Sequence, residues 1–256
     1  MKKVASLRYG VIFKKAFSQP DIFKAFVKDF IGIELKINKV EMEKQFAPII
    51  GKVDTRFDLF AEDIDNRVIV DIQHVRYGDH YDRFLHYHCV ALLEKIASST
   101  NYHPSLRVFT IVVLTSGDKH KVDMATTDFA PRDRKGNYLN ELPHKILFVS
   151  PKYVTDETPE PYREWLLAIA DSLDEEVDET SYQRKEIRQV FDLIEQDSIS
   201  PTERFKMKDE YGMEEIQQTK VLEKTLEIAR KMLEKGIEPA TVTEITGISA
   251  DDLATL

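Results

Sequence analysis

Two acidic residues interrupt short apolar segments that read as neighbouring strands. Asp58 lies within residues 55–61 and Asp71 within residues 67–74, and the polar residues 62–66 between them are typical of a turn. If these segments pair as a β-hairpin, Asp58 and Asp71 become near neighbours across the two strands. Two carboxylates among apolar side chains are costly unless a cation lies between them. Oxygen ligands of this kind suit Mg²⁺, and a bound Mg²⁺ supports hydrolysis of a phosphodiester bond.

The hairpin also has a simpler interpretation, in which its acidic residues line a polar face that water covers. Asp54 lies on the strand face of Asp58 if the strand begins that early, which makes Asp54 a second, lower-ranked candidate for the principal acid. Gln73 shares the face of Asp71 and completes a pattern of two acids and a glutamine. This spacing alone does not decide between a metal site and a hydrated surface.

The segments around the hairpin predict an α/β core that holds these residues in place. Phenylalanines at intervals of three to four residues indicate helices, and Pro20 divides the first helical segment. Alternating or β-branched apolar residues indicate strands. The predicted order is helices in residues 9–33, strands at 35–42, 55–61 and 67–74, a helix at 79–97, and strands at 107–115 and 145–149. This order corresponds to an αβββαβ core with a mixed sheet.

Charge divides the chain into a slightly basic first part and a strongly acidic second part. Residues 1–150 carry 23 Lys and Arg against 19 Asp and Glu, whereas residues 151–256 carry 13 against 26. Any electrostatic contact with nucleic acid must therefore be made locally, by the first part. We interpret residues 1–150 as the core, residues 151–200 as a helical extension packed on it, and residues 201–256 as an acidic helical region.

The acidic region is predicted to contain a long helix followed by two short ones. The helix at 214–235 carries an apolar seam that serves either a homodimer contact or packing on the chain itself. The short helices at 239–246 and 249–256 have helix-turn-helix length but contain no Lys or Arg, so we interpret them as an assembly or capping element rather than a reader of DNA. The seam consists of Leu222, Leu226, Ala229 and Leu233.

Cysteine content and hydropathy favour a cytoplasmic protein. Cys89 is the only cysteine, which excludes a disulfide within the chain. The longest apolar stretch, near residues 108–114, is far shorter than the roughly 20 residues that a membrane-spanning helix needs. No membrane partner is therefore expected.

Several segments follow, in order, the motifs of a known family. They are residues 9–17 (YGVIFKKAF), 57–59 (FDL), 70–73 (VDIQ) and 81–87 (YDRFLHY), with weaker similarity at 229–237 and 245–249. The first four correspond to an opening helix D-x-x-F-K-x-x-F, then L-D-V, I-E-x-Q and Y-x-x-R…Y. The chain thereby resembles the recombination-promoting nuclease (Rpn) and transposase family, a branch of the PD-(D/E)XK nucleases.

The resemblance implies a restriction-endonuclease-like fold and a Mg²⁺- or Mn²⁺-dependent DNA endonuclease. Asp58 and Asp71 would bind the metal ion, together with the backbone carbonyl of Ile72. Gln73 would stand at the position where the wider superfamily has lysine.

Two residues of the following helix are further candidates. Arg83 and Tyr87 are four residues apart and therefore share a helix face. Under the resemblance they would contact the scissile phosphate or support Gln73. The alternative is an exposed arginine beside a half-buried tyrosine.

Three departures from the family pattern bear on activity. Asp71 replaces the usual glutamate, Gln73 is neutral and cannot stabilise hydroxide by charge, and Gly10 stands where the opening helix usually has an acid. These departures motivate a second hypothesis. In it the chain is a catalytically decayed nuclease-fold protein that acts as a mobile-element-associated DNA-binding or interaction module.

Overall fold

A six-stranded mixed sheet forms the centre of the first of two units into which the chain divides. The units are Met1–Arg204 and Phe205–Leu256. The structure is a computed structural model that describes residues 1–46, 55–74, 79–94, 106–249 and 253. No helix among these described residues is long and apolar enough to cross a membrane.

The sheet has the strand order β2-β3-β4-β5-β7-β6. β4 runs parallel to β5, and β5 runs parallel to β7, whereas the remaining neighbours are antiparallel. The strands are β2 Glu41–Phe46, β3 Thr55–Glu62, β4 Asn66–Gln73, β5 Arg107–Leu114, β6 Met124–Asp128 and β7 Lys145–Val149. Because β4, helix α3 (His80–Leu93) and β5 form a parallel crossover, the carboxyl end of β4 lies at the edge where such folds place ligands.

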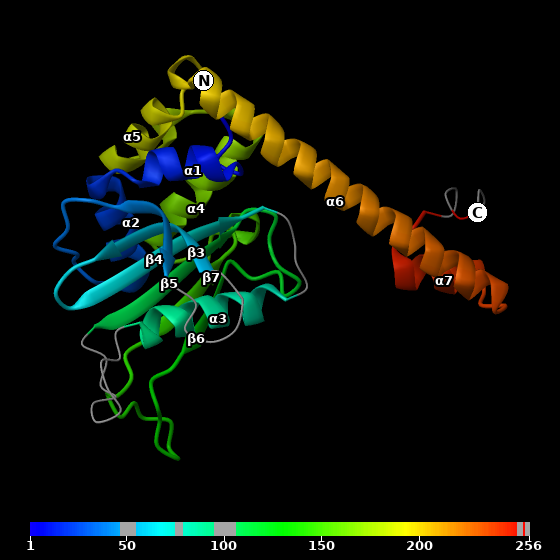
Figure 1. Cartoon of the computed structure of the whole chain (residues 1–256), viewed down its shortest axis with the longest axis horizontal. Coiled ribbons are helices and arrows are strands. Elements are labelled where there is room, and N and C mark those ends of the chain that lie inside the picture. Colours follow the sequence, from blue (N-terminus) through cyan, green and yellow to red (C-terminus); the bar gives the residue numbers. More distant parts are fainter. Residues whose placement is uncertain (47–54, 75–78, 95–105, 250–252, 254–256) are drawn as a thin grey trace. The chain divides into compact units, whose positions relative to one another are not determined.

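Helices cover both faces of this sheet (Figure 1). Helix α3 covers one face, where Phe84 packs against Val112 and Phe148 of the sheet. On the other face, Trp165 contacts the rings of Phe17 and Phe26 at 5.9 and 5.3 Å between centroids. The helices on this second face are α1 Gly10–Phe17, α2 Pro20–Ile31, α4 Tyr162–Asp171 and α5 Lys185–Leu193. The two layers enclose an aromatic core and fix α1 against β3 and β4.

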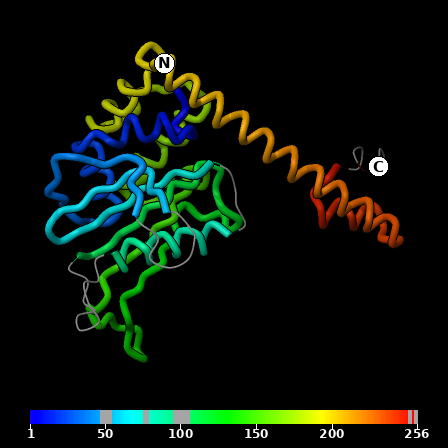
Figure 2. The backbone as a smooth tube through the Cα atoms, viewed as in Figure 1, coloured from blue at the N-terminus to red at the C-terminus, as the bar shows by residue number. Residues whose placement is uncertain are grey.

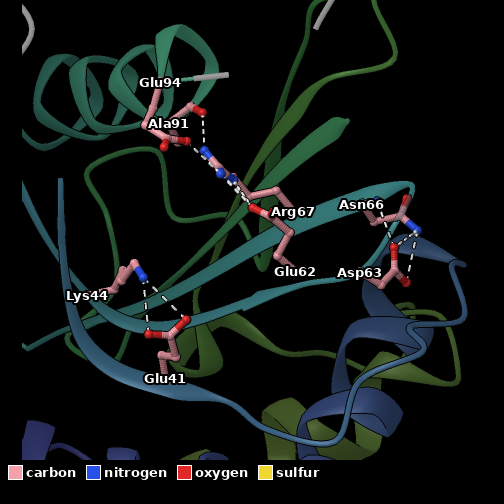
Figure 3. Close-up of polar contacts among 8 residues, drawn as sticks. All are labelled: Glu41, Lys44, Glu62, Asp63, Asn66, Arg67, Ala91 and Glu94. Atoms are coloured by element: carbon pink, nitrogen blue, oxygen red, sulfur yellow. Dashed lines mark hydrogen bonds and ion pairs between the residues drawn. The ribbon is translucent and has the colours of Figure 1, made fainter. Parts of the chain in front are cut away.

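A carboxylate closes the turn between β3 and β4 (Figure 3). Asp63 Oδ1 accepts hydrogen bonds from the backbone N–H groups of Asp65 and Asn66 at 2.9 and 2.8 Å. An aspartate that bonds the backbone of its own turn is a common turn former. The turn sets the register in which Leu59 pairs with Val70.

A buried arginine ties this hairpin to helix α3 (Figure 3). Arg67 is 1% exposed, and its guanidinium donates to Glu62 Oε2, to the carbonyl of Ala91 at 2.6 Å and to Glu94 Oε2 at 2.8 Å. A buried guanidinium is tolerated only when its donors are satisfied in this way. Arg67 therefore fixes α3 over the hairpin that carries Asp58 and Asp71.

The two ends of the first unit meet in a small second sheet. Strand β1 (Lys2–Lys3) pairs with β8 (Glu176–Val177), and the N–H of Ala5 donates to the carbonyl of Ile194 at 2.7 Å. Figure 2 shows the blue N-terminal trace beside the yellow-green segment that precedes the long helix. Residues 151–204 are thus part of the first unit.

The second unit contains most of helix α6 (Pro201–Glu234) and helix α7 (Pro239–Thr246). Three of the four predicted seam residues pack within this unit: Ala229 lies in a cluster with Val242 of α7, with Leu226 and Leu233 against it. Only Leu222 of the seam is largely exposed, at 55%. The seam therefore mainly serves the chain's own fold, and the homodimer stays a prediction.

The structure confirms the α/β class but corrects several elements. Residues 35–42 are mostly irregular rather than a strand, although Leu35, Ile37 and Val40 are buried, and the strand β2 begins only at Glu41. Two elements were not predicted: β6, an edge strand with the polar sequence MATTD, and the helix α5. The predicted helix 249–256 lies outside the described residues except for Ser249 and Leu253.

The long helix begins earlier than predicted. The predicted helix begins at residue 214, whereas α6 begins at Pro201. The N–H of Ser200 donates to Glu203 Oε2 at 2.7 Å, and the N–H of Glu203 donates to Ser200 Oγ at 3.3 Å. This reciprocal pair is a capping box, and proline is favoured at the first helical position.

Candidate active site

A cavity of about 530 Å³ lies at the carboxyl end of β4. Helix α3 lines one side of it, and the edge strand β2 with the neighbouring strands β3 and β4 lines the other. The lining residues are Gln45, Arg56, Asp58, Asp71, Ile72, Gln73, His74, Arg83, Phe84 and Tyr87. The structure thus brings together every site residue predicted from the sequence except Asp54, which lies outside the described residues.

Asp58 and Asp71 exchange backbone contacts across the hairpin. The N–H of Asp58 donates to Asp71 Oδ1 at 3.0 Å, and the N–H of Ile72 donates to Asp58 Oδ2 at 3.1 Å. The regular pairing of β3 with β4 ends one residue earlier, at Leu59 and Val70. Beyond this point the two carboxylates, rather than backbone carbonyls, accept hydrogen bonds from the N–H groups of the opposite strand.

The other neighbour of β3 is also irregular at this point. Met42 pairs with Leu59 and Lys44 pairs with Phe57, but Glu43, which lies opposite Asp58, has a φ of +55°. This backbone region is uncommon for a residue with a side chain, and its occurrence at a cavity is typical of functional sites. Asp58 is thus released from regular pairing on both sides.

Asp71 is the more buried of the two acids. The residue is 4% exposed, and its side-chain oxygen Oδ2 has no hydrogen-bond partner among the described residues. Burial, and next the Asp58 carboxylate, raise the pKa of Asp71 well above its ordinary value, although Arg83 and Lys14 act in the opposite direction. A buried carboxylate oxygen with no donor is unfavourable, and a cation beside it would remove that cost.

Lys14 of α1 reaches the acidic pair from the opposite layer. Its Nζ lies 3.4 Å from Asp58 Oδ1 and also contacts Glu43 Oε1. Burial alone would lower the pKa of Lys14, but the carboxylates of Asp58 and Glu43 outweigh this effect and raise it. Lys14 is therefore a firmly charged neighbour of the site.

Gln73 and His74 are held by the end of strand β5. The carbonyl of Gln73 accepts from the N–H of Thr115 at 3.1 Å, and His74 Nδ1 lies 2.8 Å from Thr115 Oγ1. Gln73 is 8% exposed, so its amide is confined to the cavity wall. The bond from Thr115 holds the backbone of Gln73 at the cavity.

Arg83 and Tyr87 share one face of α3, as their spacing predicts. The Arg83 guanidinium carbon lies 5.4 Å from the centroid of the Tyr87 ring, within cation–π range. The Tyr87 ring packs edge-on against Phe57 at 5.7 Å. Tyr87 thus supports an exposed cation at the cavity wall.

The donor set suits a hard divalent cation. Each acid uses one oxygen for a backbone N–H, which leaves Asp58 Oδ1, beside the Lys14 ammonium, and the buried Asp71 Oδ2. No group of three or more His, Cys, Asp or Glu able to hold a metal occurs among the described residues. Two carboxylates supplemented by a carbonyl, water and phosphate match the habits of Mg²⁺ rather than those of Zn²⁺. The residues present therefore fit Mg²⁺ or Mn²⁺.

Sequence reasoning missed three charged or polar groups of the site. Lys14 lies within the segment that carries the resemblance, but it is 44 residues from Asp58 and only the fold brings the two together. Arg56 lies two residues before Asp58, and His74 follows Gln73 directly. Their positions in the strand segments next to the predicted site residues were the available signal that they line the same cavity. The positive φ of Glu43 has no signal in the sequence.

The mixed sheet with helices on both faces is consistent with the PD-(D/E)XK nuclease fold. A family model described as PD-(D/E)XK nuclease family transposase matches residues 9–224, and the chain belongs to this family. A second model, the C-terminal HTH domain of the Rpn/YhgA-like nuclease family, matches residues 222–256. The resemblance to the Rpn family is thereby confirmed. No curated protein and no solved structure matches the chain.

The second match corrects the interpretation of the C-terminal helices as an assembly or capping element. Helix-turn-helix domains are typically DNA-binding, so the match indicates DNA as a partner. The earlier interpretation relied on the absence of Lys and Arg from residues 239–256. The matched segment also includes the end of α6 and the residue after it, which together carry the cations Lys224, Arg230, Lys231 and Lys235.

Proposed function

We propose that this chain is a divalent-metal-dependent DNA endonuclease that hydrolyses a phosphodiester bond. The observation that carries the proposal is the pair of carboxylate oxygens, Asp58 Oδ1 and Asp71 Oδ2, that remain after the backbone contacts across the hairpin are made. Asp58, Asp71 and the carbonyl of Ile72 would hold Mg²⁺ or Mn²⁺. The family match supports the reaction class.

The other cavity residues have separate roles in this proposal. A bound divalent cation would activate water and neutralise charge that develops on the phosphate. Gln73 orients the attacking water through its amide but adds no charge, because it is neutral. Arg83, on top of the Tyr87 ring, offers a guanidinium that suits a phosphate group.

Nicking of supercoiled plasmid in the presence of Mg²⁺ tests this function. We expect the wild-type protein to convert plasmid to the nicked form and Asp71→Ala to be inactive. Asp65→Ala is the matched control, because Asp65 is an exposed acid at the far end of the same hairpin. Equal activity of the wild type and Asp71→Ala would reject the proposed site.

The second candidate is a catalytically decayed protein of the same fold that binds DNA without cutting it. It is favoured by the first turn of α1, which begins at Gly10 and contains no acidic residue. Calorimetric titration distinguishes the two functions. Retained duplex binding without binding of Mg²⁺ or Mn²⁺ would favour the decayed protein.

Further expectations from the sequence stay proposals. They are the cytoplasmic location, the homodimer, and the division of the chain into residues 1–150, 151–200 and 201–256. DNA contact by the first part is supported by its slightly basic charge and by the arginines that line the cavity.

A further inference from the structure

Lys14 contacts one of the two carboxylate oxygens that are not bonded to a backbone N–H and that are therefore candidate metal ligands. Asp58 Oδ2 is bonded to the N–H of Ile72, so Asp58 Oδ1 is the oxygen that remains for a cation. The Lys14 ammonium lies 3.4 Å from this oxygen. A lysine ammonium and a divalent cation cannot both bind the same oxygen without strong mutual repulsion.

Lys14 has a second carboxylate within reach. Its ammonium also contacts Glu43. The Glu43 carboxylate forms a second ion pair with Arg56, whose Nε lies 2.8 Å from Glu43 Oε2. Glu43 lies opposite Asp58 on the neighbouring strand, at the position with positive φ. The ammonium can therefore leave Asp58 and stay paired with Glu43.

The backbone of Lys14 is fixed, so only its side chain is free to respond. Its neighbours on α1, Phe13 and Phe17, are buried, and their rings stack at 4.2 Å. The Lys14 side chain is 19% exposed and lies between α1 and β3. A small change of its side-chain angles would move the ammonium away from Asp58 while it stays in contact with Glu43.

We propose that Lys14 is the internal counter-ion of the metal site and competes with the divalent cation for Asp58 Oδ1. This inference rests on the proposed metal site. Lys14 neutralises Asp58 while no cation is bound and keeps only its contact with Glu43 when one binds. The protein thereby binds the metal more weakly than the bare carboxylate pair would, and the acids stay ordered without it.

Calorimetric titration of the full chain with Mn²⁺ tests the competition. We expect Lys14→Met to bind Mn²⁺ about tenfold more tightly than the wild type, because a positive charge near a ligand oxygen is removed; this corresponds to about 1.4 kcal/mol. Lys14→Arg keeps the charge and should retain affinity close to that of the wild type. Metal-free Lys14→Met should unfold at a lower temperature, and Mn²⁺ should raise this temperature more than in the wild type.

Lys15→Met is the matched control. Lys15 is the next residue of the same helix, but its Nζ bonds the carbonyl of Ser198 at 2.6 Å and Glu203 Oε2 at 3.2 Å, away from the acids. Its Mn²⁺ affinity should equal that of the wild type.

The outcomes separate this inference from the proposed function. If the wild type binds Mn²⁺ and Lys14→Met binds it equally or more weakly, the counter-ion role is overturned while the metal site stands. If neither protein binds Mn²⁺, both the metal site and the counter-ion role are overturned. Tighter binding by Lys14→Met, with Lys14→Arg and Lys15→Met unchanged, supports both.

Discussion

The backbone N–H of Asp58 donates to Asp71 Oδ1 at 3.0 Å, at the point where strands β3 and β4 stop pairing. The carboxylate of Asp58 in turn accepts the N–H of Ile72. Each acid is thus oriented by the opposite strand and keeps one oxygen for another partner. This exchange positions two carboxylates side by side without any direct bond between them, which is the requirement for sharing a cation.

The buried charge of Asp71 has a measurable cost in stability. We expect Asp71→Asn to raise the free energy of unfolding at neutral pH in the absence of metal, by about 1–3 kcal/mol, the usual cost of an unsatisfied buried polar group. The folded-state pKa of Asp71 is raised, so the wild type regains this stability as pH falls through that pKa towards the unfolded value.

Urea unfolding with EDTA at several pH values measures this effect. The difference between Asp71→Asn and the wild type should shrink on acidification and vanish near pH 4, close to the unfolded pKa of an aspartate. A difference that is constant between pH 8 and pH 4 would show that the charge of Asp71 is not what costs stability.

Gln73 is predicted to act on water rather than to pack. Gln73→Lys should retain or raise the rate of plasmid nicking, because lysine restores the charge that the wider superfamily uses. Gln73→Leu should lower the rate more than tenfold, because leucine cannot form a hydrogen bond with water. Initial rates at saturating Mg²⁺ measure both variants, with thermal unfolding as the check on folding. A leucine variant as fast as the wild type would assign Gln73 a packing role.

The hairpin and its acids could be predicted from the sequence, because a polar turn between alternating strands determines which residues meet. The predicted proximity of Asp58 and Asp71 holds, and Gln73, Arg83 and Tyr87 line the same cavity. Residues 35–42 could not be assigned, because buried side chains in an irregular segment mimic strand alternation. Contacts between layers, such as that of Lys14 with Asp58, depend on how α1 packs on the sheet, which local patterns do not specify.

We expect His88 to lower the free energy of unfolding in acid, independently of the metal site. It is fully buried, its Nδ1 lies 2.9 Å from Thr110 Oγ1, and burial followed by the nearby His144 lowers its pKa to about 3. The unfolded chain binds a proton below about pH 6.5 and the folded chain does not, so stability falls from there towards pH 3.

Chemical unfolding between pH 7 and pH 4 measures the contribution of His88. The free energy of unfolding should fall with a component of up to about 1.4 kcal/mol per pH unit, and His88→Gln should lose this component. His86→Gln is the control, because His86 is an exposed histidine of the same helix. An unchanged slope in His88→Gln would show that this histidine is protonated in the folded state.

A homodimer would supply two active sites for the two strands of a duplex. We expect light scattering to give the mass of a dimer at tens of micromolar, and Leu222→Glu, at the exposed seam residue of α6, to shift it towards the monomer. Thr219→Glu adds the same charge one turn away and should have a smaller effect. A monomeric mass for the wild type would reject the dimer and leave nicking of one strand as the expected activity.

The anomalous scattering of Mn²⁺ tests the central claim most directly. In crystals grown with Mn²⁺, we predict one anomalous peak per chain, about 2.1 Å from both Asp58 Oδ1 and Asp71 Oδ2, the distance at which small hard cations bind oxygen. The peak should be absent from Asp71→Ala crystals grown in the same way. A wild-type map with no peak between the two acids, or with its peak elsewhere, would contradict the proposed metal site.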